Sequence, residues 1–206
     1  MEIIDPNFIY SNFVRDKTLP DRIKDYFNKN TEYHRKGVGY QIEKGPIRDK
    51  IKQDKNVKDS TDICFTMENT VNIDILSDFL KELQIVLEKY MDKYPWCNKG
   101  DPFTIKTFNI QNYKPREGFY SWHCERLTSF GPVKNRHLVW MMYCDDFENE
   151  GGTEFLYQNY TSKSEKGKIL IWPSDWTFTH RGQFCTKEKT IITGWYDFFR
   201  DEQIYT

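Results

Sequence analysis

The sequence Phe103-Thr-Ile-Lys-Thr-Phe-Asn-Ile-Gln-Asn-Tyr113 decides the fold class of this 206-residue chain. Apolar and polar residues alternate along it, which is the pattern of a strand with one buried face. Further short segments follow, all rich in aromatic and β-branched residues and separated by Gly, Pro, Asn or Asp: 118–125, 137–145, 153–157, 167–172, 177–180 and 187–199. Many short strands with regular turn signals predict a β-sandwich or barrel.

Upstream of these strands, residues 73–94 carry the clearest helix signal. Apolar residues recur at i, i+3 and i+4 spacing from Leu76 to Tyr94, so one helix face is apolar. Pro95 disfavours helical geometry at Tyr94 and should end the helix there. A shorter helix is expected at about 21–28. The apolar face predicts that the long helix packs against the sheet, which gives an α+β, mainly β domain.

The length of the chain favours one domain over residues 1–206. Within it we expect residues 1–100 to form a support region of helices and loops, and residues 101–200 to form the β core. The 30 Lys and Arg residues nearly balance the 31 Asp and Glu residues. This balance argues against a uniformly basic protein that binds nucleic acid or a membrane surface.

Three features of the sequence predict a cytoplasmic location. The longest apolar run, Leu138–Cys144, is far shorter than the ~20 residues of a membrane span. The amino terminus lacks the pattern of a secretory signal. The five cysteines form no C-x-x-C pair, which indicates reduced thiols. Because the chain has no alanine and is rich in Lys, Asn, Ile and Tyr, we also expect a genome biased toward A and T, such as that of a phage or a streamlined bacterium. A phage origin would place the protein in a host cytoplasm.

A polar, basic segment lies between residues 35 and 58. It contains eight cationic and three anionic side chains and is interrupted by Gly37, Gly39, Gly45 and Pro46. These breaks predict a loop with at most a short strand. The charge is explained either by solvent exposure or by contact with an anionic substrate or partner.

Among the four histidines, His123 stands out because Glu125 follows two positions later. In an extended strand these two side chains share one face, where a nitrogen and an oxygen donor can bind one metal ion. His180 follows after intervening strands. Two imidazoles and one carboxylate form the facial set of non-haem Fe(II) oxygenases. His34 and His137 are better explained as surface or strand-edge residues.

The last strand places a lysine on one face with apolar neighbours. Period-two alternation groups Lys189 with Ile191, Thr193 and Trp195. Burying that ammonium group without an anionic partner would be costly, and a bound dicarboxylate would supply the partner. The alternative is that Lys189 begins the strand and extends to solvent.

Residues 103–199 resemble the 2-oxoglutarate/Fe(II)-dependent dioxygenases, most closely the prolyl 4-hydroxylase-like branch with its phage and marine bacterial members. The resemblance is carried by these segments, in this order: Ile110-Gln-Asn-Tyr113, Tyr120-Ser-Trp-His123-Cys-Glu125, Glu150-Gly-Gly-Thr-Glu-Phe155, Gly167-Lys-Ile-Leu-Ile-Trp172, His180-Arg-Gly182 and Lys189-Thr-Ile-Ile-Thr-Gly-Trp195. It implies a double-stranded β-helix, or jelly-roll, core buttressed by N-terminal helices.

The resemblance also implies a metal and an activity. His123, Glu125 and His180 would ligate Fe(II), and O2 and 2-oxoglutarate would be cosubstrates, with ascorbate as a candidate reductant. The expected reaction hydroxylates an organic substrate with release of succinate and CO2. A peptide or small molecule is favoured as that substrate, with peptidyl proline as the leading candidate.

The cosubstrate pocket follows from the same resemblance. The far carboxylate of 2-oxoglutarate would pair with Lys189, supported by the hydroxyl of Tyr113, and Trp195 would line the pocket. Two departures from the family pattern matter. Glu125 replaces the usual Asp, although a carboxylate at this position still favours hydroxylation over halogenation. The order Gly151-Gly-Thr-Glu154 differs from Gly-Gly-Glu-Thr, so Thr153 and Glu154 receive no role.

Two other functions remain open. A nucleic-acid base oxygenase or demethylase of the same fold would pair the cosubstrate with arginines on the last strand, where this chain has Lys189 and Trp195. A metal-binding barrel without oxidative chemistry would have no need for a dicarboxylate pocket. The presence of Lys189 and Trp195 therefore favours the hydroxylase over both alternatives. No membrane partner is expected.

Overall fold

A computed structural model describes residues 5–43, 50–70, 72–129 and 131–199 of the chain. Its helices are α1 (Leu19–Lys29), α2 (Met67–Thr70) and α3 (Asp74–Lys93). Its strands are β1 (Tyr10–Phe13), β2 (Arg35–Glu43), β3 (Lys50–Thr66), β4 (Phe103–Tyr113), β5 (Arg136–Tyr143), β6 (Thr153–Phe155), β7 (Tyr160–Ser162), β8 (Lys168–Pro173), β9 (His180–Gly182) and β10 (Lys189–Phe198). No described helix is long and apolar enough to span a membrane.

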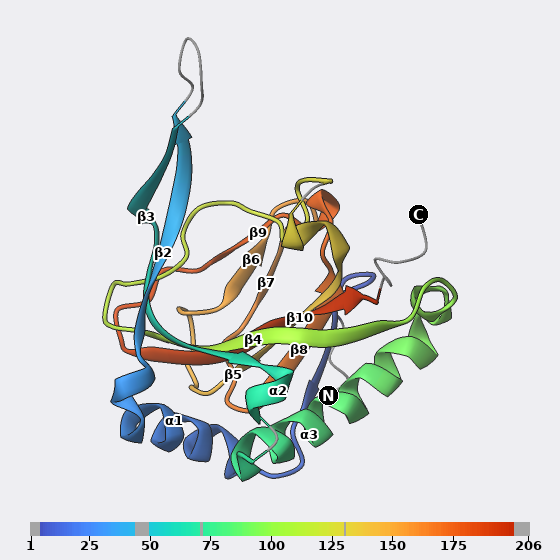
Figure 1. Cartoon of the computed structure of the whole chain (residues 1–206), viewed down its shortest axis with the longest axis horizontal. Coiled ribbons are helices and arrows are strands. Elements are labelled where there is room, and N and C mark those ends of the chain that lie inside the picture. The colour runs from blue at the N-terminus through green and yellow to red at the C-terminus, as the bar shows by residue number, and fades with distance from the viewer. Residues whose placement is uncertain (1–4, 44–49, 71, 130, 200–206) are drawn as a thin grey trace.

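Two antiparallel sheets form the core of the molecule. The large sheet has the strand order β1-β8-β5-β10-β4-β3-β2, and the small sheet has the order β7-β6-β9. Helices α1 and α3 run along one side of the large sheet (Figure 1). The mainly β jelly-roll fold with supporting helices is thus confirmed.

Alternation along β5 shows how one strand serves two hydrophobic layers. Leu138, Trp140 and Met142 join the cluster that contains the buried faces of α1 and α3. The intervening Val139 and Met141 join a second cluster, which also contains residues from the small sheet. Because side chains alternate along β5, this strand contributes to one hydrophobic layer between the helices and the large sheet and to another layer between the two sheets.

The helix predicted at 73–94 is confirmed as α3, which ends at Lys93, just before Tyr94 and Pro95. Its buried residues include Leu76, Phe79 and Leu83, which pack in the cluster beneath the large sheet. The shorter helix is also confirmed as α1.

The prediction of a loop at 35–58 was wrong. Strands β2 and β3 pair there as an antiparallel hairpin that projects from the body of the molecule (Figure 1). Polar side chains on both strands hide the alternation that normally signals a strand, while backbone pairing still satisfies the ladder. A Cβ atom on Gly37 would lie 2.2 Å from Oγ of Ser60, so this glycine permits close packing of the two strands. The predicted positions 44–49 lie outside the described residues.

The sheet also extends beyond the expected β core of residues 101–200. Strands β1, β2 and β3 precede residue 100, and β3 pairs with β4 in the large sheet. Strands β1 and β7 were not predicted.

Two predicted strands differ in the structure. Residues 118–125 form a connection with only isolated bridges, from Phe119 to Lys58 and from His123 to His180. The expected strand at 177–180 is a 3₁₀ helix, Trp176–Phe178, followed by β9. Phe178 is buried in the cluster between the sheets, and Phe119 stacks on His123. Aromatic residues are also enriched in strands, so these segments look like strands in the sequence.

Candidate active site

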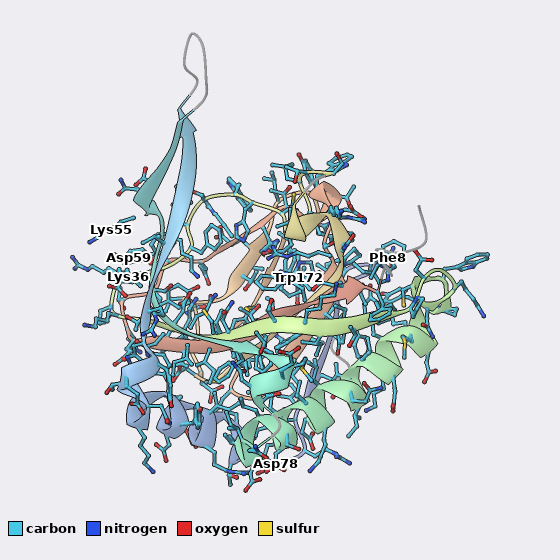
Figure 2. All side chains as sticks on the ribbon, viewed as in Figure 1. Phe8, Lys36, Lys55, Asp59, Asp78 and Trp172 are labelled. Carbon is cyan, nitrogen blue, oxygen red and sulfur yellow. The ribbon has the colours of Figure 1, made fainter. Side chains whose placement is uncertain are left out.

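A cavity of about 900 Å³ lies over the inner face of the large sheet. Figure 2 shows Trp172, one of its lining residues, in the interior of the molecule and far from Asp78 on α3. The cavity is lined by all the site residues predicted from sequence, namely Tyr113, His123, Glu125, His180, Lys189 and Trp195. The structure therefore brings together side chains that are spread over more than 80 positions of the sequence.

Three of these residues offer donor atoms that could hold one metal ion. The donor atoms of His123, Glu125 and His180 all lie within 4.8 Å of one another. Oε1 of Glu125 is 3.4 Å from Nε2 of His123 and 3.7 Å from Nε2 of His180. Two imidazole nitrogens and a carboxylate oxygen match the facial donor set of non-haem iron sites.

Backbone pairing fixes the two histidines relative to one another. The N–H of His123 donates to the carbonyl of His180 at 3.0 Å, and the N–H of His180 donates back at 2.8 Å. His180 begins β9, whose pairing with β6 places it opposite Phe155. One reciprocal bridge thus replaces the full strand that was expected around His123.

Hydrogen bonds at the other ring nitrogens orient both imidazoles. Nδ1 of His123 lies 2.9 Å from the carbonyl oxygen of Ser121, and Nδ1 of His180 lies 2.9 Å from that of Phe178. A carbonyl only accepts, so Nδ1 carries a proton in each ring, and in the neutral form of each imidazole Nε2 is the nitrogen with a free lone pair. This outer-shell arrangement is typical of metal-binding histidines.

The charge states also suit metal binding. Burial, together with the neighbouring His123, lowers the pKa of His180 to about 4 although Glu125 opposes the shift. Burial raises the pKa of Glu125, but the hydrogen bond and charge of His123, with the charge of Arg136, outweigh it and lower that pKa to about 2. At neutral pH the carboxylate is therefore ionised and the His180 ring is neutral, as metal ligands require.

Alternation along β10 places the lysine as predicted. The cavity is lined by Lys189, Ile191, Thr193 and Trp195, whereas Ile192 lies in the layer between the large sheet and the helices. Lys189 is buried, and its register partner across the sheet is Tyr113 on β4. It does not extend to solvent.

Within the part of the chain that the structure describes, the Lys189 side chain donates one hydrogen bond and contacts one aromatic ring. Its Nζ donates to the carbonyl of Gly151 at 2.9 Å and lies 5.3 Å from the ring centroid of Tyr113. Burial lowers the pKa of Lys189 to about 8, against the opposing charges of Cys185 and Asp145. Among the described residues Lys189 forms no ion pair, unlike Lys58 and Arg136, the other cations that line the cavity.

The two other predicted pocket residues have specific contacts. The hydroxyl of Tyr113 donates to Oε1 of Gln111 at 2.6 Å. The indole N–H of Trp195 donates to Oε2 of Glu125 at 2.9 Å, so this side chain contacts a candidate metal ligand directly. Thr153, left without a role by sequence, lines the cavity and accepts the hydroxyl hydrogen of Tyr143, whereas Glu154 pairs with Arg181.

The cavity residues that sequence reasoning missed include Phe119, Arg136 and Lys58. Phe119 stacks on the imidazole of His123, and Arg136 pairs with Glu125 at 2.7 Å. Lys58 comes from the hairpin that was predicted to be a loop, and its Nζ pairs with Asp62 at 2.9 Å. No motif marks these residues, because each reaches the cavity through strand pairing.

Comparison with known proteins places a family match over the segment that carries the site. Residues 108–197 match the family model described as the 2OG-Fe(II) oxygenase superfamily, a segment that contains every predicted site residue. No curated protein matches the chain.

Several solved structures share the fold. A Pseudomonas putida prolyl-4-hydroxylase superposes with a TM-score of 0.64 at 10% identity, covering 94% of each chain. A viral collagen prolyl hydroxylase from Paramecium Bursaria Chlorella virus-1, in its 2OG complex, gives 0.60 at 12% identity, with 97% of this chain and 100% of that chain covered. A Trichoplax adhaerens prolyl hydroxylase in complex with a hypoxia inducible factor peptide fragment gives 0.61 at 12% identity, with 93% and 84% covered.

At these identities the structures establish the fold, and the family model covers the segment that carries the candidate site. Residues 108–197 are thus similar to the 2OG-Fe(II) oxygenase superfamily, and this similarity together with the three donor residues supports Fe(II), 2-oxoglutarate and O2 as cofactors.

Proposed function

We propose that this protein is a hydroxylase in which His123, Glu125 and His180 bind Fe(II). The observation that carries the proposal is the convergence of three donor atoms within 4.8 Å, in one cavity with a buried lysine that has no carboxylate partner among the described residues. The Nδ1 hydrogen bonds leave Nε2 of each imidazole facing the site, and Glu125 is ionised. The two Nε2 atoms and the Glu125 carboxylate are therefore the donor atoms that a metal ion would use.

Lys189 and Tyr113 would hold the far carboxylate of 2-oxoglutarate. The Lys189 ammonium group sits in a buried position where an anion would offset its desolvation cost. The Tyr113 hydroxyl, now bonded to Gln111, lies on the register partner of the lysine and can donate instead to a carboxylate. Together they would orient the cosubstrate toward the three donor atoms.

When bound, Fe(II) and 2-oxoglutarate would activate O2 and supply the oxidant that hydroxylates the substrate, with release of succinate and CO2. The protein orients the bound groups and shields them from water. Glu125 also supports hydroxylation over halogenation, because the carboxylate fills the ligand position that a halide would need.

Peptidyl proline is the substrate that we propose first. Support comes from the fold shared with prolyl hydroxylases, one of which was solved with a peptide fragment. The cavity is large enough for more than a five-carbon diacid, since ligand pockets of roughly 300–1,000 Å³ accommodate drug-sized molecules. A nucleic-acid base is less well supported, because Lys189 and Trp195 occupy the last-strand positions where arginines would be expected.

Anaerobic titration with Fe(II) and 2-oxoglutarate tests the metal and cosubstrate assignments. The wild type should develop a weak visible charge-transfer band, and His180→Ala should lose it. His34→Ala is the matched control, because His34 stacks on Phe27 outside the cavity and should leave the band intact. A silent spectrum from folded wild-type protein would favour a metal-binding barrel without oxidative chemistry.

Succinate formation tests the substrate class. A proline-rich peptide should stimulate 2-oxoglutarate turnover, whereas an alkylated or methylated oligonucleotide should not. Stimulation by the oligonucleotide alone would replace the prolyl hydroxylase proposal with the base oxygenase.

A further inference from the structure

One carboxylate oxygen of Glu125, Oε2, accepts hydrogen bonds from two side chains on neighbouring strands. Nη1 of Arg136, at the start of β5, donates to Oε2 at 2.7 Å. Nε1 of Trp195, on β10, donates to the same oxygen at 2.9 Å. Strands β5 and β10 pair directly, so the two donors are fixed relative to each other by the sheet.

The two donors also pack against one another. Cζ of Arg136 lies 3.6 Å from the ring centroid of Trp195, a close cation–π contact. Nη1 of Arg136 reaches the main-chain oxygen of Glu125 as well, at 3.2 Å. Glu125 is thus held at both its backbone and its carboxylate, and the Glu125 side chain is only 13% exposed.

This arrangement divides the two carboxylate oxygens of Glu125 between different tasks. Oε2 accepts two hydrogen bonds, while Oε1 faces Nε2 of both His123 and His180. A carboxylate that uses one oxygen in this way presents the other to a metal ion. The ionised guanidinium also offsets the cost of burying the carboxylate charge.

We propose that Arg136 and Trp195 are positioning residues that hold Glu125 for coordination of the metal through Oε1 alone. The inference rests on the proposed function, because it assumes that the metal binds to His123, Glu125 and His180. It also gives Trp195 a contact with the metal ligand in addition to its place in the cavity wall.

Glutamate has the length that these contacts need. An aspartate at position 125 would be shorter by one methylene, about 1.5 Å. With the backbone unchanged, its oxygens could not reach the metal and also keep hydrogen bonds of 2.7 and 2.9 Å to Arg136 and Trp195. The effect of Glu125→Asp on metal affinity should therefore be coupled to the effect of removing the hydrogen-bond donor at Arg136 or Trp195.

Binding of Co(II) to the apo protein, followed by its visible d–d spectrum, tests the proposal without turnover. Trp195→Phe keeps a ring under Arg136 but removes the N–H donor, and Arg136→Lys keeps a positive charge but loses the planar geometry. Each should weaken Co(II) binding roughly 10-fold or more and alter the spectrum. Arg15→Lys is the matched control, because it changes a guanidinium–carboxylate pair with Glu82 that lies outside the cavity.

A double-mutant cycle separates positioning from a general structural effect. Trp195→Phe should cost little further Co(II) affinity in the Glu125→Asp background, because the contact is already lost there. Equal cost in both backgrounds would overturn the dependence on glutamate. Wild-type affinity and spectrum in a folded Trp195→Phe protein would overturn the positioning role itself.

The wild type distinguishes this failure from failure of the proposed function. If wild-type protein binds Co(II) and His180→Ala does not, the metal site stands whatever the Trp195 variant does. If wild-type protein fails to bind Co(II), both proposals fall. Far-UV circular dichroism of each variant shows that it is folded, and Arg136→Lys serves where a larger change at that position would prevent folding.

Discussion

The ring of Phe119 lies parallel to the imidazole of His123, with centroids 3.6 Å apart and planes inclined by only 4°. Phe119 is itself fixed from two sides. Its carbonyl accepts the N–H of Gly182 at 2.7 Å, and it forms an isolated bridge with Lys58 on β3. The hairpin, β9 and the loop carrying His123 are therefore joined at one aromatic residue.

Removing the Phe119 ring should loosen the His123 imidazole and weaken metal binding. Phe119→Ala should lower Co(II) affinity roughly 2- to 10-fold, the equivalent of the ~0.5–1.5 kcal/mol that aromatic pairs contribute. Isothermal titration calorimetry measures the change. Phe184→Ala, at a residue that is 53% exposed, should leave the affinity unchanged. Equal affinity in the Phe119 and Phe184 variants would show that stacking does not orient the ligand.

The buried charge of Lys189 should lower the stability of the apo protein. Lys189→Met keeps the length of the side chain without the ammonium group, so it should raise the melting temperature at pH 7, by roughly 2–4 °C per kcal/mol gained. The same variant should lose 2-oxoglutarate binding. Differential scanning fluorimetry with and without 2-oxoglutarate measures both effects. A lower melting temperature for the variant would mean that the ammonium group stabilises the fold.

The sign of the pH dependence follows from the direction of the pKa shift. The pKa of Lys189 is about 8 in the folded protein and 10.5 in the unfolded reference. Between these values the unfolded chain binds more protons, so the stability of the wild type rises with pH relative to Lys189→Met. The advantage of the Met variant should therefore be largest below pH 8 and shrink toward pH 10.

Cosubstrate binding should show the opposite trend with pH. A carboxylate pairs with the charged form of Lys189, which is lost as pH rises through about 8. The affinity of Mn(II)-loaded protein for 2-oxoglutarate should fall about fivefold from pH 8 to pH 9, as the charged fraction of Lys189 falls from about one half to about one eleventh. Lys189→Arg, if it binds 2-oxoglutarate, should lack this dependence, because arginine remains charged throughout. A flat wild-type profile would argue against pairing between Lys189 and the cosubstrate.

Gly194 is required for packing on the face of β10 that points toward the helices. A Cβ atom there would lie 2.5 Å from Cζ2 of Trp140 and 2.6 Å from Cβ of Phe108. Gly194→Ala should therefore destabilise the protein by about 1–3 kcal/mol, measured by denaturant unfolding. Gly100→Ala, with no atom within 4 Å of the new Cβ, is the matched control and should change stability much less.

The sequence by itself determined the features that depend on local periodicity. The alternation in β4 and β10 and the apolar stripe of α3 follow from the spacing of apolar residues, which is the same in any fold that buries one face. Alternation also assigned Lys189 and Trp195 to a common face, and the structure places both in the cavity wall. The identity of His123, Glu125 and His180 as a candidate donor set came from residue type and order.

Only the tertiary structure decided which groups meet. The bridge between His123 and His180, the pairing of Arg136 with Glu125 and the stacking of Phe119 join residues through strand register, which sequence spacing does not encode. The hairpin of β2 and β3 was not predicted from the sequence, for a related reason. Its polar strands are specified by backbone hydrogen bonds to each other and to β4, and those bonds exist only once the sheet has formed.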